Sequence, residues 1–292
     1  MRVWYRSLAI IQGMCFEGAS QETSVACPSP ATRVPQEIVE MIIIHLIHDT
    51  PSLLACSLTC YSWYMATVSH LHDTLITPTN TRRANPRFLW PKSLPCMHRL
   101  GLLPLVKKFK ICKRTRYLVK RFTPQQLNCC TLRHFLALTN VQELGIDYLD
   151  IPAFIPEIRK YFGHFLPTVR SLSLRNPRGS NRHIIYFIGL FEHLNDLKLL
   201  SDEVAGSLDG DPEDDPSLFP FFAPPLRGQL TITCFRKVAL LRDMVDLFGG
   251  IRFRHMDLVD VEGMRLLLGA CAKTLETLRL YPTDPRGMKP PR

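Results

Sequence analysis

One short pattern of apolar and polar residues recurs along the chain after residue 100. Apolar residues occupy positions 4 and 6 of a six-residue run, where they flank a single intervening residue, and position 1 is apolar in every copy except 227–232. Alternation with a period of two is typical of a β-strand with one buried face, so each copy predicts a strand. The copies are residues 141–146, 169–174, 194–199, 227–232, 253–258 and 275–280, with a weaker one at 106–111.

The spacing of these copies predicts how the strands are connected. From Leu144, the equivalent positions follow at intervals of 28, 25, 33, 26 and 22 residues. The longest interval contains the acidic, proline-rich segment 209–225, which we interpret as a loop inserted into a repeat. Helix-like segments lie between the strands, at residues 131–138, 155–166, 182–191, 238–248 and 261–271.

A helix that returns the chain to begin the next strand beside the last produces a parallel sheet. Repeats of this length with one strand and one helix each are typical of leucine-rich repeats. We therefore predict an α/β fold in which residues 87–283 form an irregular leucine-rich-repeat-like solenoid with a parallel sheet. The alternative is an ordinary α/β domain whose buried strands share the same pattern.

Strand alternation also predicts which side chains lie on the open face of that sheet. The residues between the two inward positions are Gly145, Ser173, Lys198, Thr231, Asp257 and Arg279, and their outer neighbours include Glu143, Asp147, Ser171, Arg175, His255 and Tyr281. The candidate target-binding residues among them are Glu143, Asp147, Arg175, Lys198, Thr231, Asp257, Arg279 and Tyr281. No single chemistry dominates this set, so it does not name a target.

A different pattern, with apolar residues every three or four positions, occupies residues 34–71. Pro35 suits the first turn of a helix, and Pro51 should end that helix because the residue before proline avoids the α conformation. Residues 52–60 and 61–71 then predict two further short helices. Three helices in fewer than forty residues make a small core, so this unit should depend on a neighbour or a partner.

The first of these helices is apolar on more than one side. We expect one half of its circumference to be buried within the unit, namely Ile38, Val39, Ile42, Ile43, Leu46 and Ile47. Met41 and Ile44 fall on the opposite side. A helix that is apolar on both sides needs a second partner, which we expect to lie outside the chain.

The sequence of this helical segment resembles an F-box, in particular that of mushroom-forming fungi. It opens with Val34-Pro35-Gln36-Glu37-Ile38 and continues with Leu54-Ala55-Cys56-Ser57-Leu58-Thr59-Cys60-Tyr61-Ser62-Trp63. Val34 stands where the family usually has Leu, and Tyr61 stands where it usually has a basic residue. The alternative is a helical subdomain that only packs on the core that follows it.

The resemblance implies binding to the Skp-type adaptor of a cullin–RING (SCF) ubiquitin ligase. The residues it implies for adaptor binding are Pro35, Ile38, Met41, Ile42, Ile44, Leu54 and Trp63. Irregular leucine-rich repeats commonly follow the F-box in this fungal family, so the resemblance agrees with the strand pattern. The expected layout is a disordered leader at 1–33, the F-box at 34–76, a linker at 77–86, the solenoid at 87–283 and a disordered tail at 284–292.

Composition favours a folded protein of a reducing compartment. The ten cysteines are too few for a disulfide scaffold, so we expect cytoplasm or nucleus. No apolar run reaches the ~18 to 20 residues of a membrane span, and the run after Arg6 is too short for a signal peptide. The net charge is +10, with eight basic residues in 107–121 and seven acidic ones in 202–215. Without a groove-reading module, we interpret the basic segment as a surface for an acidic protein or for solubility rather than for nucleic acid.

No catalytic motif is recognisable, so we expect neither an enzyme nor a small-molecule substrate nor a cofactor. His45 and His48 lie three residues apart without a third ligand, which favours a solvated helix face over a metal site. Segment 209–215 is acidic but lacks the later residues of a calcium loop. The predicted function is a substrate receptor of an SCF-type ligase, and the alternative is a leucine-rich-repeat scaffold that never meets a ligase.

The chain stops soon after its last predicted strand, whereas chains of the family it resembles often run longer. No helix remains to cover that strand. We therefore expect the last strand to be exposed or poorly ordered, or the chain to be a truncated relative of the longer ones.

Overall fold

The computed structural model describes residues 34–78, 97–112, 134–148, 150–201, 225–233, 238–247, 250–259, 261 and 263–281. These residues fall into two compact units, a helical unit that ends at Asp73 and a sheet unit that begins at Thr74. The expected leader 1–33 and tail 284–292 lie outside the described residues. So do residues 79–86 of the expected linker, 113–121 of the basic segment and 209–224 of the acidic segment.

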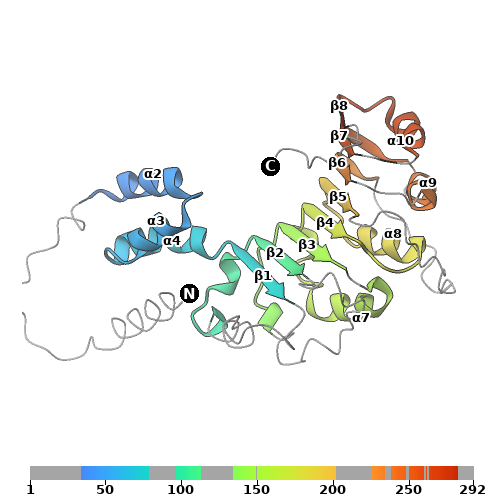
Figure 1. The fold of residues 1–292 in the computed structure, drawn as a ribbon. Helices are drawn as coiled ribbons and strands as arrows, with labels where there is room; N and C mark the ends of the chain where they lie inside the picture. Colours follow the sequence, from blue (N-terminus) through green and yellow to red (C-terminus); the bar gives the residue numbers. More distant parts are fainter. Residues whose placement is uncertain are drawn as a thin grey trace, which may run out of the picture. The chain divides into compact units, whose positions relative to one another are not determined.

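The helical unit contains the three predicted helices (Figure 1), which are α2 (Gln36–Leu46), α3 (Thr50–Ser57) and α4 (Tyr61–Leu71). Asp49 lies between α2 and α3 and is the N-cap of α3, because its carboxylate accepts a hydrogen bond from the Ser52 N–H at 3.4 Å. Pro51 lies in the first turn of α3, where its missing N–H costs nothing. His48 follows the end of α2, so His45 and His48 do not share a helix face as expected, and both are exposed.

The core of the helical unit is small. Val39 and Ile43 of α2 and Leu53 of α3 are its buried apolar centre, against which half-buried side chains such as Trp63 of α4 pack. A hydrogen bond of 2.5 Å from the Ser62 hydroxyl of α4 to the side-chain oxygen of Gln36 links α4 to α2. With so few buried side chains, the unit leaves much of its apolar surface uncovered.

In the described part of the sheet unit, eight parallel strands follow one another in the order of the chain, and each pairs with its neighbours in sequence. The strands are β1 (Thr74–Pro78), β2 (Lys108–Cys112), β3 (Glu143–Asp147), β4 (Ser171–Arg175), β5 (Asp196–Leu200), β6 (Arg227–Thr233), β7 (Arg252–Val259) and β8 (Thr277–Tyr281). The seven predicted strands and the parallel α/β sheet are confirmed. Strand β1 was not predicted, and it crosses the expected domain boundary at residue 76 into the expected linker.

Four helices lie on the same side of this sheet (Figure 1), namely α7 (Ile151–Tyr161), α8 (Asn181–Gly189), α9 (Val238–Leu247) and α10 (Met264–Cys271). One continuous core fills the space between the helices and the sheet. Helix α7 begins four residues before the predicted start, with Pro152 in its first turn. None of the helices in the described ranges has the length and apolar character that crossing a bilayer requires.

The register of the strands aligns equivalent residues into rows across the sheet. Two inward rows form its buried side. The first is Leu75, Phe109, Leu144, Leu172, Leu197, Leu230, Met256 and Leu278, and the second includes Ile111, Ile146, Leu174, Leu199, Ile232, Leu258 and Leu280. From β1 to β7 these side chains are buried, whereas both leucines of β8 are exposed. The expected exposure of the last strand is therefore confirmed.

A polar side chain at one repeated position forms a hydrogen bond between neighbouring turns of the repeat. Asn140, Thr168 and Thr274 each lie four residues before the first inward residue of their strand. Their side chains donate hydrogen bonds to backbone oxygens of the preceding turn, at 2.8 Å from Asn140 to Pro104, 2.7 Å from Thr168 to Val141 and 3.2 Å from Thr274 to Phe253. These bonds therefore link each turn of the repeat to the one before it.

Strand β6 departs from the predicted pattern. The sequence places Arg227 at the first apolar position of its copy, but Arg227 is exposed and Leu226 is buried instead. The register shifts between Gly228 and Gln229, which is a β-bulge. Gly228 has a φ of +89°, a conformation that suits glycine, and the shift skips Arg254 of β7 in the register.

Candidate interaction surfaces

The first candidate site is an apolar surface on the helical unit. Eight large apolar side chains of this unit are at least one third exposed, and we call them the helical apolar surface: Ile38, Met41, Ile42, Ile44, Ile47, Leu58, Tyr61 and Met65. Met41 and Ile44, predicted to need an outside partner, are 53% and 57% exposed. Exposed large apolar side chains are typical of protein-binding surfaces, which makes this set a candidate.

The sequence prediction placed too many residues of α2 in the core. Ile38, Ile42 and Ile47 were expected to be buried within the unit, but they are 41%, 37% and 39% exposed. The reason is the small size of the partner helices, since α3 and α4 cover only the narrow stripe of Val39 and Ile43. The exposed apolar arc of α2 is therefore wider than the sequence indicated.

The predicted adaptor-binding residues divide into an exposed and a half-buried group. Ile38, Met41, Ile42 and Ile44 are exposed side chains of α2, and Pro35 is exposed just before that helix. Leu54 and Trp63 are half-buried, so their main contribution is to the packing of α3 and α4. Leu58, Tyr61 and Met65 were missed, although all three lie close in sequence to Trp63.

The second candidate site is the open face of the sheet. It bears the odd-numbered side chains of β3, β4, β6 and β8, those of β7 from His255 onward, and the even-numbered ones of β2 and β5. The middle row runs Ile76, Lys110, Gly145, Ser173, Lys198, Thr231, Asp257 and Arg279. The sequence prediction that Gly145, Ser173, Lys198, Thr231, Asp257 and Arg279 share one face is confirmed. Their role in target binding stays a prediction.

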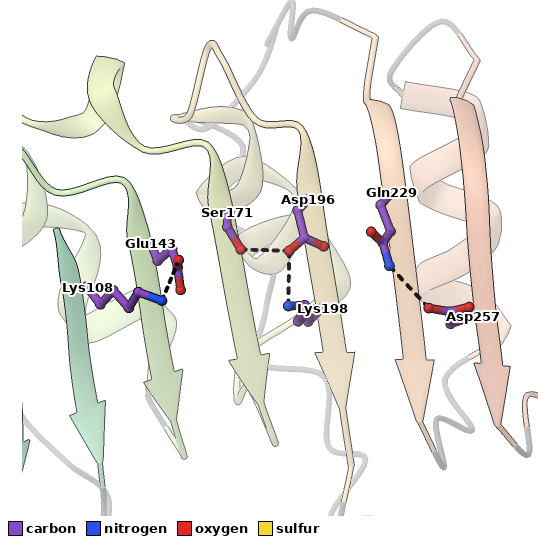
Figure 2. Close-up of polar contacts among 7 residues, drawn as sticks. All are labelled: Lys108, Glu143, Ser171, Asp196, Lys198, Gln229 and Asp257. Atoms are coloured by element: carbon purple, nitrogen blue, oxygen red, sulfur yellow. Dashed lines mark hydrogen bonds and ion pairs between the residues drawn. The ribbon is translucent and has the colours of Figure 1, made fainter. Parts of the chain in front are cut away.

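Ion pairs and hydrogen bonds connect neighbouring strands across this face (Figure 2). Lys108 pairs with Glu143 at 3.1 Å, and the Ser171 hydroxyl donates to Asp196 at 2.8 Å. Asp196 also pairs with Lys198 at 3.1 Å within β5. Further along, the Gln229 amide donates to Asp257 at 3.1 Å. Polar contacts of this kind hold the outward side chains in fixed positions above the sheet.

The cations of the open face lie further out than the anions. The side chains of Lys110, Lys198 and Arg279 are 43%, 41% and 65% exposed, whereas their partners Asp147, Asp196 and Asp257 are 10%, 23% and 21% exposed. The pairing distances are 3.5 Å, 3.1 Å and 4.0 Å in the same order. A partner that approaches the face therefore meets the positive end of these three pairs first, whereas Lys108 and Glu143 of the fourth pair are about equally exposed.

The predicted target-binding residues all lie along β3 to β8, in the three outward rows of the sheet. Glu143, Asp147, Lys198, Asp257 and Arg279 take part in the ion pairs described above. Arg175, Thr231 and Tyr281 lie in the same rows. Sequence reasoning missed Asp196 and Gln229, although both precede an inward leucine as Glu143 does and could have been selected by that rule.

Other polar clusters have a structural explanation. The Ser180 hydroxyl lies 2.7 Å from Nδ1 of His183 and accepts a hydrogen bond from the His183 N–H, which is the geometry of a helix cap at the start of α8. Burial raises the pKa of the Cys56 thiol, which keeps it protonated at neutral pH. Within the described ranges, no three His, Cys, Asp or Glu side chains are grouped as metal ligands.

A shallow polar depression of about 380 Å³ opens before strands β4 to β6. Arg170, Glu192, His193 and Arg227 line it together with Asn195, Leu194 and Pro225. Small-molecule sites are mainly apolar with a few convergent polar groups, and this depression has the opposite composition. It does not compete with the two surfaces as a functional site.

Comparison with known proteins adds no further guide to function. No family model matches this chain, and no curated protein is similar to it. The function must therefore be inferred from the two surfaces themselves and from the sequence resemblance of the helical unit.

Proposed function

We propose that this chain is a substrate receptor of an SCF-type ubiquitin ligase. In this proposal the helical unit is an F-box that binds the Skp-type adaptor, and the sheet unit is a leucine-rich-repeat solenoid that binds a target protein. The chain itself performs no chemistry, and it acts in the cytoplasm or nucleus by holding the target near an enzyme carried elsewhere in the ligase.

The observation that carries the proposal is the exposure of Met41 and Ile44 together with the rest of the helical apolar surface. A unit whose buried apolar centre is three side chains gains stability when another protein covers eight exposed ones. The resemblance of its sequence to an F-box indicates a Skp-type adaptor as the covering protein. Sequential parallel strands backed by helices on one side support the solenoid interpretation of the other unit.

The adaptor half of the proposal is tested by co-expression with a Skp-type adaptor and purification through the adaptor. We expect the wild-type chain to co-purify and the double variant Ile42→Asp, Ile44→Asp to be lost. The matched control is Ile76→Asp, because Ile76 of β1 is 54% exposed and belongs to the sheet unit. Co-purification of the double variant at the wild-type level would contradict the proposal, as would equal loss of the control.

The open face of the sheet favours a target with an acidic surface, because cations form the outer ends of the three ion pairs of Lys110, Lys198 and Arg279. Lys198→Glu would place an acid beside Asp196 and reverse the outermost charge at the centre of the face. We expect this variant to lose captured target proteins while retaining the adaptor. Equal loss of target and adaptor would indicate misfolding and would refute a role specific to the target.

A further inference from the structure

Strand β8 has a free edge and an uncovered inner side. Among the described residues it pairs with β7 alone, and no strand lies on its other side. Leu278 and Leu280 occupy the inward rows, where the equivalent residues of β1 to β7 are buried, yet they are 37% and 48% exposed. The edge therefore offers unpaired backbone groups and apolar side chains at the same place.

The hydrogen-bond pattern of the sheet shows which backbone groups face this edge. Residues in phase with the inward positions donate their N–H groups to the next strand in the sheet. The Tyr148 N–H donates to the Arg175 oxygen, and the Asn176 N–H donates to the Leu200 oxygen. Tyr148 and Asn176 lie two residues after an inward residue, and therefore in phase with it. By the same alternation, the N–H groups of Leu278 and Leu280 point away from β7 toward the free edge.

The sheet itself shows what sequence fits against β8. On its paired side, Met256-Asp257-Leu258 of β7 lies in register with Leu278-Arg279-Leu280, so apolar residues are adjacent and the Asp257 carboxylate lies 4.0 Å from Nε of Arg279. The guanidinium of Arg279 is 65% exposed, which leaves it accessible from the other side. A segment with the same order, apolar, acidic, apolar, would repeat these contacts on the free edge.

We propose that the free edge of β8 binds an extended segment of a partner protein, in parallel orientation, with an acidic residue between two large apolar residues. This site shares Arg279 with the open face of the sheet, whereas its backbone edge, Leu278 and Leu280 belong to neither surface of the proposed function. The segment continues the sheet by one strand, covers Leu278 and Leu280 with its apolar residues, and places its acid beside Arg279.

A second copy of this chain fits the edge less well than such a segment. Antiparallel pairing of two β8 strands, with Leu278 opposite Leu280, would set Arg279 opposite the same cation of the other copy. Parallel addition of β1 from another copy would place Ile76 beside Arg279, because Ile76 occupies the same row. Neither arrangement places an acidic side chain beside Arg279.

The test uses the full chain and a fluorescent peptide with the β7 sequence, residues 252–259, in a fluorescence-polarisation titration. We expect binding to weaken about fivefold when the peptide carries Asp257→Lys. The protein variant Arg279→Glu should reverse this preference and favour the lysine peptide. Failure of the wild-type chain to bind the β7 peptide, or indifference of Arg279→Glu to the peptide charge, would overturn the proposal.

A pair of variants separates the backbone contribution from the side chain. Leu280→Pro removes both the leucine and its edge-directed N–H, whereas Leu280→Ala removes only the side chain. Proline is tolerated in an edge strand where its nitrogen faces away from the paired strand, and circular dichroism would verify folding. We expect Leu280→Pro to bind the peptide about threefold to tenfold more weakly than Leu280→Ala. Equal affinities, or a wild-type dimer in sedimentation that Leu280→Pro converts to monomer, would refute binding of a partner segment here.

Discussion

Two leucines of the same inward row should differ sharply in what they contribute to stability. Leu199 of β5 and Leu280 of β8 occupy equivalent places in the sheet, but Leu199 is 0% exposed and Leu280 is 48% exposed. Replacing each by alanine removes the same atoms from the same strand position. The difference in cost therefore measures how well the core covers that position.

The expected magnitudes follow from the burial. Leu199→Ala loses a fully buried side chain and leaves a cavity, which costs about 2.7 to 5 kcal/mol in the free energy of unfolding. Leu280 keeps about half of its surface in water and has no enclosed site to leave empty. Its substitution should cost only about half of the transfer free energy of a leucine, or about 1 kcal/mol.

Urea unfolding followed by far-UV circular dichroism measures both costs from the midpoint and slope. A slope that differs among the three proteins would mean that the transition is not shared and would call for hydrogen exchange instead. The reasoning is refuted if Leu280→Ala costs as much as Leu199→Ala, because β8 would then be covered as well as β5. That result would also contradict the proposal that exposed leucines of β8 contact a partner segment.

Three further predictions concern positions where local geometry decides the outcome. Gly228→Ala would place a Cβ 2.1 Å from the Asn195 backbone oxygen at a φ of +89°, so we expect the free energy of unfolding to fall by about 2 to 4 kcal/mol, whereas Gly269→Ala, in open space, should not destabilise α10. Asp49→Ala should lower the stability of the helical unit by about 0.5 to 2 kcal/mol, measured by Trp fluorescence, and Asp49→Asn should retain the cap. Burial lowers the pKa of His72 below its ordinary value of 6.5. The stabilisation that neutral His72 gives the folded state is therefore complete above pH 6.5 and is lost as the pH falls, because the unfolded chain binds the proton more readily. His72→Gln should reduce the acid sensitivity of the unfolding midpoint.

The sheet could be predicted from sequence because its signal is local and repeated. Alternating apolar residues specify both the strand and its buried side, and helix-sized intervals specify the parallel order. Strand β1 was missed because its pattern is ambiguous. Leu75 is its buried residue, but Ile76 is equally apolar and faces the open side, and Pro78 follows within the strand. An isolated strand without alternation has no local signal to distinguish it.

The details that sequence could not predict depend on contacts between distant residues. The burial of Leu226 and the exposure of Arg227 accompany the register shift beside Gly228, which is visible only in the pairing of β6 with β7. The exposure of Ile38 depends on how much of α2 the two short helices can cover, which periodicity does not specify. The middle row of the open face was predicted correctly from β3 to β8, but the outward position of its cations depends on which side chains pair, as Lys198 does with Asp196.

Exposure also makes the functional tests interpretable. Ile44 and Leu280 are apolar, but neither is enclosed by its own unit, so replacing either one removes little of the stability of the fold. Substitution of Val39 or Leu199, which are fully buried, would confound binding with folding. Because the apolar residues proposed to bind partners are those that the fold does not cover, loss of binding after their substitution reports on the interface itself. The same separation of contributions holds for the helical apolar surface and for the free edge of β8.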